Sequence, residues 1–319
     1  SSPRPSVCAI SWPRPPGPTP MPGPEPGSLF ASPEGRRAGR LLEFSAVLEL
    51  VAGQCALGRA ADLLRGEEPV NDAEWLRRQW LWFEELRRFS ETGGEIELGS
   101  CADLHQLIGD ERSDSGPLGG EELAAIAGAA TTLAEMLRSV HAAADRLPLT
   151  GKHLRGVVDP RPLADRLHAA LEPSGQVRDS ASPALGRLRR DQAAAESRVR
   201  DVARREMQRA RDAGYSSGDE LVLRGDRLCV PVRSGSRADV GGIIHDRSST
   251  GHTLFIEPTR VVEAGNAFVE ARLAVLEEER RILIDLNREV GFRAPELVDL
   301  FDRAVVLDAM RARVRFAKQ

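Results

Sequence analysis

Two long stretches of the chain carry apolar residues at helical spacing, and they enclose a segment that alternates like β-strands. The first stretch starts at Ser182-Pro183, where serine suits a helix cap and proline suits the first turn, and meets no breaker before Gly214. The second starts near Thr259 and is expected to stop at Gly291. Each stretch is about 30 residues long, or roughly 45 Å as a helix. The matched lengths predict an antiparallel helix pair.

The segment between the two helices predicts a small antiparallel sheet. Period-two apolar patterns bounded by glycine or serine indicate four short strands, and we expect them to follow one another as a meander. Pro231 has no N–H to donate to a strand ladder, so its strand should lie at an edge or contain a bulge. The expected strands are Leu221 to Arg224, Leu228 to Arg233, Val240 to Asp246 and Thr253 to Ile256.

The first 180 residues divide into a proline-rich start and a helical part. Residues 1–40 are rich in Pro, Gly, Ser and Arg and carry too little apolar surface to fold, so disorder is expected, with a proline-rich ligand for a partner as the alternative. Helical patterns follow, one capped at Asn71 and others over about 120–146 and 160–171. The residues expected on the buried faces of the first two helices are Phe44, Val47, Leu48, Val51, Cys55, Trp75, Trp80, Phe83 and Leu86.

These patterns predict a mainly α protein with a helical core and a long antiparallel helix pair that carries the small antiparallel β-sheet at its tip. A last helix, from Pro295 to Phe316, is expected to return the chain to the core. The expected boundaries are 1–40 for the disordered start, 41–181 for the helical core, 182–214 for the outgoing helix, 215–258 for the sheet, 259–291 for the return helix and 292–319 for the last helix.

Composition narrows the choice of function classes. The 319 residues are 41% hydrophobic and 29% charged with a formal net charge of −4, so attraction to nucleic acid or to an anionic membrane must come from a local basic patch. The four cysteines are far apart and form no CxxC pair, which indicates neither a zinc site nor a disulfide framework and fits a reducing cytoplasm. No stretch approaches the roughly 20 apolar residues of a membrane span, so no membrane partner is expected.

Four segments stand out by their residue order: Leu42-Glu43-Phe44, Gly175 to Ser182 with the following Leu188-Arg189, Arg224 to Val232, and Gly242 to Pro258. In these segments and in their order, the chain resembles the bacterial MutS type-two family, relatives of the mismatch-repair protein MutS, over about residues 41–319. The residues that match the family's motifs are Asp179, Ser180, Ser182, Arg227, Pro231, His245, Asp246, Gly251, Glu257 and Pro258.

The resemblance implies a MutS-type core, a lever formed by the helix pair and a clamp formed by the sheet. It also implies a parent protein that is a cytoplasmic homodimer with ATPase and endonuclease domains, uses ATP and magnesium, and closes around branched or duplex DNA or around ribosomal RNA. Mismatch-repair-like processes, suppression of homologous recombination and rescue of stalled ribosomes are the roles that follow from it.

The chain itself is expected to carry no ATPase, no nuclease and no cofactor. A phosphate loop has the pattern GxxxxGK[ST], in which backbone amides and the lysine hold the phosphates. The single Gly-Lys pair, Gly151-Lys152, is followed by His153 and has no glycine five residues before it. This pair therefore fails as a phosphate loop, and the chain end at Gln319 leaves no room for a nuclease domain after the last helix.

A cluster of polar residues within thirteen positions invites a catalytic or metal-site hypothesis. Neighbouring side chains on a strand point to opposite faces, so His245 and Asp246 are expected to diverge, and no second cluster supplies the missing ligands. The preferred interpretation is a turn in which Gly251 adopts a positive φ, while His245, Arg247 and His252 stay free for a ligand. The cluster consists of His245, Asp246, Ser248, His252 and Glu257.

Charge placement favours nucleic-acid binding. Nine arginines and four acids lie between Arg187 and Arg211, whereas the return helix is acidic around Glu277-Glu278-Glu279. Binding through such residues should be salt-sensitive and blind to sequence. The rival interpretation is a structural coiled coil for protein association, whose two helices pair by charge. The candidate binding residues are Arg198, Arg204, Arg205, Arg209, Arg211, Arg233, Arg237, Arg247 and His252.

Overall fold

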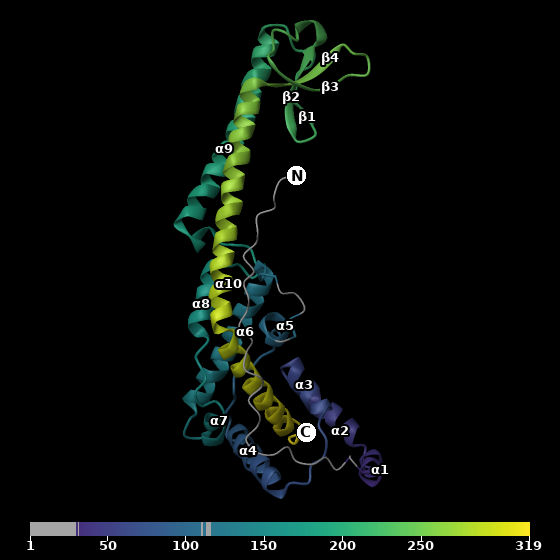
Figure 1. The fold of residues 1–319 in the computed structure, drawn as a ribbon, viewed down its shortest axis with the longest axis vertical. Helices are drawn as coiled ribbons and strands as arrows, with labels where there is room; N and C mark the ends of the chain where they lie inside the picture. Colours follow the sequence, from purple (N-terminus) through teal and green to yellow (C-terminus); the bar gives the residue numbers. More distant parts are fainter. Residues whose placement is uncertain (1–29, 31, 110, 113–115) are drawn as a thin grey trace, which may run out of the picture. The chain divides into compact units, whose positions relative to one another are not determined.

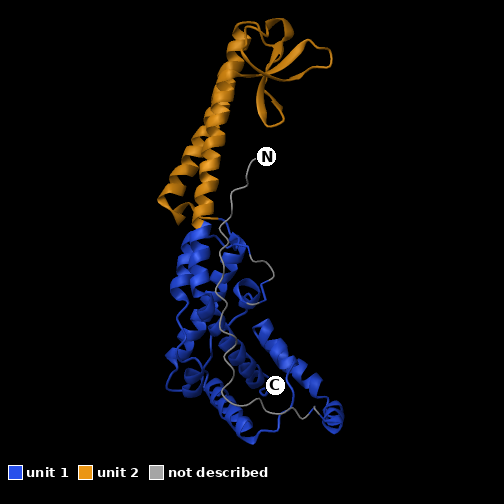
Figure 2. Ribbon diagram, viewed as in Figure 1, with its two compact units in different colours: residues 1–176, 283–319 blue, residues 177–282 orange. Residues whose placement is uncertain are grey.

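The computed structural model describes residues 30, 32–109, 111–112 and 116–319. The chain divides into two compact units, residues 1–176 with 283–319 and residues 177–282 (Figure 2). The expectation of disorder for residues 1–29 and 31 lies outside the described residues. Residues 33–40, however, form most of a helix that Ser32 caps by accepting a hydrogen bond from the Gly35 amide at 2.9 Å, so the expected disorder is wrong there.

The long elements in the described part of the first unit are helices, and they are built around a buried helix, α6. The fully buried side chains of α6 include Leu123, Ile126, Leu133 and Met136, which lie on one stripe at helical spacing. The helices are α1 (Pro33–Leu41), α2 (Phe44–Ala52), α3 (Gly58–Arg65), α4 (Ala73–Glu91), α5 (Leu104–Ile108), α6 (Gly120–Ala142), α7 (Pro148–His153), α8 (Arg161–Ala170) and the part of α10 (Thr259–Phe316) from residue 283 onward (Figure 1).

Helix α6 corrects the statement that no stretch is apolar enough for a membrane span. Among the described residues it is the one helix that could cross a membrane by length and composition. In the structure 56% of its most apolar window is buried inside the protein, as in the central helix of many folded domains. Length and composition alone are therefore weak grounds for placing α6 in a membrane.

Helix α4 shows where the predicted buried face was wrong. Its cap is Asp72, whose carboxylate accepts from the Trp75 amide at 2.8 Å, and not Asn71. The buried stripe begins at Trp82 (8% exposed) and continues to Leu86, as predicted, and Phe89. Trp80 is 59% exposed, because a helix that is apolar on several sides can bury only the side that meets its neighbours. Val47 on α2, also predicted to be buried, is 42% exposed.

Helix α10 runs without a break for 58 residues, so the predicted stop at Gly291 and the separate helix from Pro295 are both wrong. Proline removes one backbone hydrogen bond from a helix, at a cost of about 3 kcal/mol. Packing offsets this cost, since Val290, Ala294 and Leu297 are buried. Tertiary burial therefore overrides the local breakers in this helix.

The buried side chain of Asn287 on α10 holds the segment that leads into α6. The Asn287 side-chain amide donates to the Leu118 carbonyl at 2.9 Å and to the Leu283 carbonyl at 2.8 Å. The Asn287 carbonyl oxygen accepts from the Leu118 amide at 2.7 Å. With 1% exposure, the side chain is paired on both of its polar ends, which fixes the end of the loop that leads into α6.

The second unit contains two antiparallel helices, which we call the arm: α9 (Pro183–Asp212) and the part of α10 up to residue 282 (Figure 1). As predicted, Ser182 caps α9, accepting from the Leu185 amide at 3.0 Å. Contacts at both ends of the arm show the antiparallel sense, because Ser182 bonds to Glu278 while Glu206 lies 3.7 Å from Arg260. The short η2 turn (Asp179–Ala181) precedes α9.

The chain segment between the two arm helices forms a four-stranded antiparallel sheet at one end of the arm (Figure 1). Its strands are β1 (Val222–Arg224), β2 (Arg227–Arg233), β3 (Gly242–Arg247) and β4 (Thr253–Pro258), with the η3 turn (Ser234–Ser236) after β2. The order is β1-β2-β4-β3, so the predicted meander is wrong: β4 lies between β2 and β3. One face packs on α9, where Met207 and Ala210 meet Val230, Val232, Leu254 and Ile256.

The structure shows how the sheet accommodates Pro231. Its carbonyl accepts from the Ser217 amide at 3.0 Å, on the side of β2 away from β4. The nitrogen and oxygen of one residue point the same way in an antiparallel strand, so the proline nitrogen also faces away from β4. On that side the β1 pairing ends at Cys229, and an isolated bridge from Ser216 to Val232 follows, so β2 is nearly an edge where Pro231 lies, as expected.

Candidate nucleic-acid interface

Four of the predicted binding residues lie on neighbouring segments at one end of the sheet. The amide of Ser234 in η3 donates to the His252 carbonyl at 2.9 Å, which joins the η3 loop to the β3–β4 turn. The register places Arg233 opposite Thr253 at the same end. All four candidate side chains are exposed. We call this group the basic end, and its members are Arg233, Arg237, Arg247 and His252.

The β3–β4 turn is held by hydrogen bonds within the turn, and Gly251 has the positive φ that the sequence predicted. Gly251 adopts φ 74°, and its amide donates to the Ser248 carbonyl at 2.8 Å. The Ser248 hydroxyl accepts from the Thr253 amide at 3.1 Å, and Asp246 accepts from the Arg247 amide at 2.7 Å. The turn therefore presents the Arg247 and His252 side chains on an ordered backbone.

The arginines of the basic end have no acidic partner in the structure. Among the described residues, no ion pair joins Arg233, Arg237 or Arg247 to a carboxylate. A guanidinium offers forked donors that match phosphate oxygens, and an unpaired one loses no internal contact when a phosphate binds. This group is therefore the part of the candidate set best placed to contact an anion.

The arm arginines differ, because most of them are already paired on their own helix or next to it. Arg204 lies 3.4 Å from Asp201, Arg209 lies 2.6 Å from Glu206, and Arg211 lies 3.6 Å from Asp219. Arg205 donates to a backbone carbonyl at 3.2 Å. Arg198 has no ion pair within the described part of the chain. Exposed pairs contribute at most about 1 kcal/mol, so phosphates can compete for these arginines.

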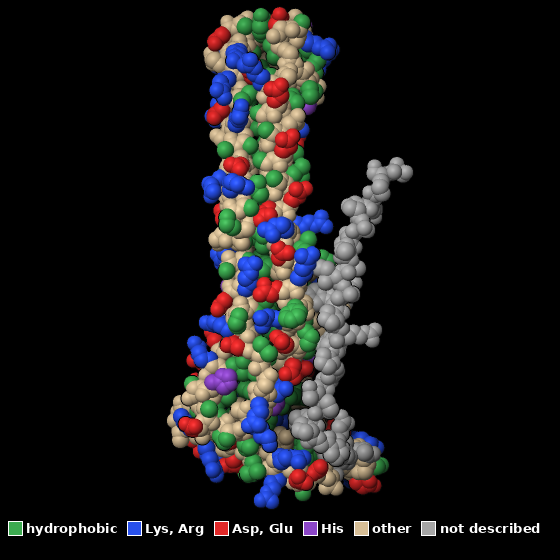
Figure 3. All heavy atoms as spheres, turned by 60° about the vertical axis from the view of Figure 1, so that its left-hand side comes forward, with side chains coloured by type: hydrophobic (Ala, Val, Ile, Leu, Met, Phe, Trp, Pro, Cys, Tyr) green, Lys and Arg blue, Asp and Glu red, His purple; other side chains and the backbone are tan. Residues whose placement is uncertain are grey.

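Charge pairing between the two arm helices, the basis of the rival interpretation, is limited to a few sites. Arg189 donates to Glu279 across the arm at 2.6 Å and to the Val177 carbonyl at 2.9 Å, and it also bonds to Asp179. Near the sheet, Arg260 reaches Glu206 at 3.7 Å. Elsewhere along the described arm, acidic and basic side chains alternate over the surface (Figure 3). Among the described residues, charge pairing across the arm thus consists of one ion pair at its base and one near the sheet.

The motif before α9 builds that base. Ser182 caps α9 and its hydroxyl donates to Glu278 at 2.6 Å, while Asp179 pairs with Arg189. Hydrogen bonds from Arg281 and Ser182 lower the pKa of Glu278 to about 2. Ser180 lies in η2 and is exposed. Asp179 and Ser182 therefore stabilise the arm and lie far along the chain from the basic end.

The expectation that His245 stays free is wrong. Its Nε2 lies 2.8 Å from the buried carboxylate of Glu257, which also has Arg227 at 3.5 Å. The reason is a β-bulge: Ile244 pairs with Ile256 and Asp246 with Phe255, so His245 is an extra residue in β3. A bulge interrupts the alternation of side chains, which the sequence interpretation assumed to be regular.

The bulge also brings Asp246 to the same face as His245, against the expectation that they diverge. Asp246 accepts from Arg224 at 2.8 Å, and the Arg224 guanidinium lies 4.0 Å from the centre of the Phe255 ring. Phe255 and Glu257 share one face of β4, because residues two apart point the same way. Both polar residues of the bulge therefore serve contacts within the sheet. The strand ends at Pro258, two residues beyond the expected Ile256, and α10 begins at Thr259, as expected.

The geometry does not support a hydrolase or metal site at this cluster. In the described residues the polar partner of the His245 ring is Glu257, and no serine hydroxyl is bonded to it. No group of three or more His, Cys, Asp or Glu side chains in the described part of the chain could hold a metal. Burial raises the pKa of Cys229 to about 11, which makes it a poor nucleophile. Gly151 and Lys152, the Gly-Lys pair tested above as a phosphate loop, lie inside helix α7 and not in a loop.

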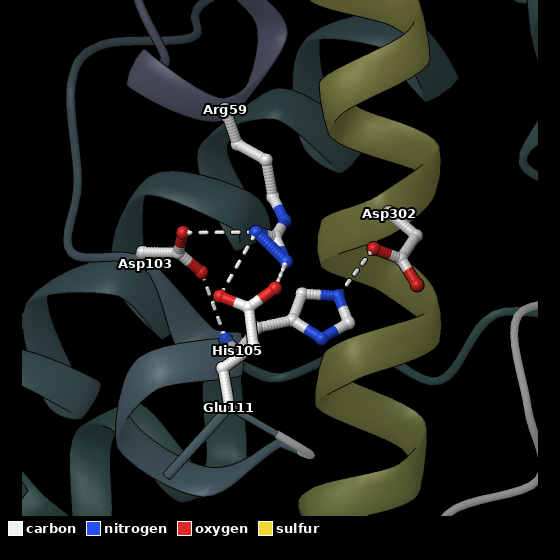
Figure 4. Close-up of polar contacts among 5 residues, drawn as sticks. All are labelled: Arg59, Asp103, His105, Glu111 and Asp302. Carbon is white, nitrogen blue, oxygen red and sulfur yellow. Dashed lines mark hydrogen bonds and ion pairs between the residues drawn. The ribbon is translucent and has the colours of Figure 1, made fainter. Parts of the chain in front are cut away.

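A second polar cluster, which the sequence did not reveal, lies in the first unit (Figure 4). His105 Nε2 lies 2.7 Å from Asp302 on α10, and Asp103 caps α5 by accepting from the His105 amide at 2.9 Å. Arg59 bridges Asp103 at 3.4 Å and Glu111 at 3.3 Å. The contacts run as a chain from Glu111 through Arg59, Asp103 and His105 to Asp302, so the cluster ties α3, α5 and α10 together. Some of the bonded residues are more than 40 positions apart in the sequence, so local sequence patterns could not predict their contacts.

A comparison with known proteins finds relatives that match most of the chain. A protein named endonuclease MutS2 from Bacillus mycoides strain KBAB4 is 31% identical over 288 residues, which cover 89% of this chain and 36% of that protein. The chain is MutS2-like in sequence. Endonuclease MutS2 of Bacillus velezensis is 28% identical over 282 residues, with 87% of this chain and 36% of the relative covered. No protein-family model matches the chain.

The MutS2-like chain spans about a third of the length of these relatives. A match over 89% of the chain extends well beyond the arm and sheet, into the helical first unit. The resemblance seen in the four short segments is therefore supported by most of the sequence.

Proposed function

We propose that the chain is the core, lever and clamp region of a MutS2-type protein, in which the arm is the lever and the sheet is the clamp. The observation that carries the proposal is the basic end, where Arg233, Arg237 and Arg247 are exposed and have no acidic partner among the described residues. Phosphate oxygens are the partners that such guanidiniums fit. The clamp would then grip the nucleic-acid backbone without reading its sequence.

The arm arginines extend this surface as a secondary contact. Arg204, Arg209 and Arg211 would have to exchange a carboxylate for a phosphate, which costs little because the three guanidiniums are exposed. Arg198 and Arg205 have no carboxylate partner in the described part of the chain, so they would give up no ion pair. The similarity to proteins named as MutS2 endonucleases supports DNA as the ligand.

For the whole protein we propose the roles that the family resemblance implies. These are a cytoplasmic homodimer that uses ATP and magnesium, binds branched or duplex DNA or ribosomal RNA, and acts in mismatch-repair-like processes, suppression of recombination or ribosome rescue. The described chain would bind nucleic acid through the clamp and position the clamp through the lever, whereas ATP hydrolysis and nuclease chemistry would belong to other parts of the protein.

A salt titration tests the clamp proposal. Three phosphate contacts on a duplex predict a slope of about −2.7 in a plot of log affinity against log salt, or a loss of about 40-fold between roughly 50 and 200 mM. Fluorescence anisotropy with labelled duplex DNA, branched DNA and a structured RNA measures this slope. The triple variant R233A/R237A/R247A should bind more weakly on every ligand and show a slope closer to zero.

The control removes the same charge from the first unit through R77A/R78A/R88A on α4, where all three arginines are exposed. Equal losses from both triple variants would mean that net charge, and not the clamp, governs binding. Absence of binding at low salt would contradict the proposal. The structural-scaffold alternative predicts instead that R204E/R205E disturbs association or helicity and leaves nucleic-acid binding intact.

A further inference from the structure

A cavity in the first unit brings two arginines next to an apolar floor. It has a volume of about 350 Å³ and lies between the end of α4, the segment that follows α4, and the last turns of α10. Ligand pockets are typically of this size, roughly 300–1,000 Å³, and mostly apolar in lining. The apolar side chains that line this cavity are all buried, and they are Leu86, Phe89, Ile96 and Val314.

The two guanidiniums at the cavity, those of Arg311 and Arg315, offer more donors than the protein uses. Arg311 is 7% exposed and donates to Asp308 at 3.1 Å and to the Ile96 carbonyl at 2.8 Å. Arg315 donates to the Gln54 carbonyl at 2.8 Å, and no carboxylate in the described part of the chain pairs with it. A guanidinium has more N–H donors than these bonds occupy, and buried donors without an acceptor are uncommon in folded proteins.

The two guanidiniums also repel each other. Burial and, after it, the charge of Arg315 lower the pKa of Arg311 to about 10, and the attraction of Asp308 opposes this shift to a smaller extent. Two like charges that line one cavity are stabilised when an anion lies between them. The cavity is therefore suited to a negatively charged ligand.

The charges around the cavity are mainly positive as well. The Lys318 ammonium bonds to the hydroxyl of Ser90, which lines the cavity. The Arg146 guanidinium lies 4.6 Å from the centre of the Phe89 ring. Against these charges stand the buried aspartate behind the first guanidinium and Glu95, an exposed acidic residue of the lining. Positive charge thus exceeds negative charge here.

We propose that the cavity binds a small organic oxyanion, with its carboxylate or phosphate group between Arg311 and Arg315 and its apolar body against Leu86, Phe89 and Val314. Forked guanidinium donors match the oxygens of both groups. An inorganic ion would leave the apolar floor uncovered, so the site should select anions that carry a carbon chain or ring. The proposal concerns the first unit and does not depend on nucleic-acid binding by the clamp.

Saturation-transfer NMR of the full chain, with hexanoate, hexyl phosphate, hexanol and acetate as probes, tests the proposal. At least one of the two hexyl anions should bind with a dissociation constant of about 1 mM, as expected for a ligand of so few atoms. Hexanol should bind at least about tenfold more weakly, because it makes no charge-assisted hydrogen bond. Acetate should also bind more weakly, since each buried methylene contributes about a factor of four.

Two variants test the two parts of the site. R315Q removes one charge and keeps an amide that can donate to the Gln54 carbonyl, so it should weaken anion binding about tenfold and leave hexanol unchanged. S90L places an apolar side chain in the cavity and should weaken both anions by filling the space. The matched control is R293Q, which removes the same charge from a half-buried site on α10 outside the lining and should bind like the original chain.

Binding of either anion that R315Q weakens and R293Q does not supports the proposal, and the tighter anion identifies the preferred group. Urea unfolding checks that each variant is folded. If neither anion binds up to about 20 mM, the proposal is wrong. It is also wrong if hexanol binds as tightly as the anions, if R293Q loses as much as R315Q, or if S90L binds like the original chain. None of these results bears on the salt dependence of nucleic-acid binding.

Discussion

Replacing Asp308 by alanine should destabilise the first unit more than most single substitutions. The carboxylate is fully buried and accepts three hydrogen bonds, from the Ala56 amide at 2.7 Å, the Leu57 amide at 2.9 Å and Arg311 at 3.1 Å. It thereby fixes the start of α3 to α10. Burial lowers the pKa of Arg311 to about 10, which shows how poorly this site is solvated.

The size of the loss follows from what the substitution leaves behind. D308A leaves two backbone amides and a buried guanidinium without their acceptor, and losing one partner of a buried ion pair costs about 3–5 kcal/mol. We expect a loss of about 4 kcal/mol in urea unfolding, or a fall of about 10 °C in the melting temperature. D302A should cost less than about 1 kcal/mol, because Asp302 is 34% exposed and has one partner.

The double variant D308L/R311L distinguishes the energy of the Asp308–Arg311 ion pair from that of the buried volume the two side chains fill. Apolar residues in place of both partners remove the stranded charge, so this variant should recover at least half of the stability that D308A loses. Equal losses for D308A and D302A would refute the reasoning, since burial would then add nothing to the strength of the carboxylate's bonds.

Two further predictions concern single hydrogen-bonded groups. Arg281 and Ser182 hold the pKa of Glu278 near 2, so the stabilising effect of this carboxylate is full above about pH 4.5 and is lost as the pH falls toward 2. The melting temperature of E278Q should therefore be lower than that of the original chain at pH 7 and equal to it at pH 2. W82F removes the indole donor that bonds a buried threonine at 2.9 Å and should cost about 1–2 kcal/mol in urea unfolding, whereas W80F, at an exposed position, should cost almost nothing.

The sequence predicted those elements whose signals are local. Ser182 and Pro183 mark the start of α9 because a cap and a first-turn proline act within one helical turn. The stop predicted at Gly291 failed because the burial of Val290 and Leu297 depends on helices far along the chain. Strand positions were also predicted to within a few residues, but their order depends on which strands meet in space, and a meander is only the simplest arrangement.

The residues of the candidate site also fall into those that the sequence could predict and those that it could not. The exposed arginines of the basic end could be proposed from charge alone, since no partner residue had to be known. His245 could not be assigned, because its bond to Glu257 depends on a bulge whose extra residue leaves no mark in the alternation of β3. The same holds for Asp302 and its bond to His105, which joins positions 197 residues apart.

The bulge at His245 has a consequence for how the protein behaves in a crowded solution. β3 is the outermost strand beyond β4, so its far side offers unpaired backbone groups to any passing strand. The extra residue bends and twists this edge, and Asp246 and Arg247 next to it add exposed charges. Such features discourage edge-to-edge stacking of sheets, so shortening β3 by one residue would regularise the edge and make aggregation easier.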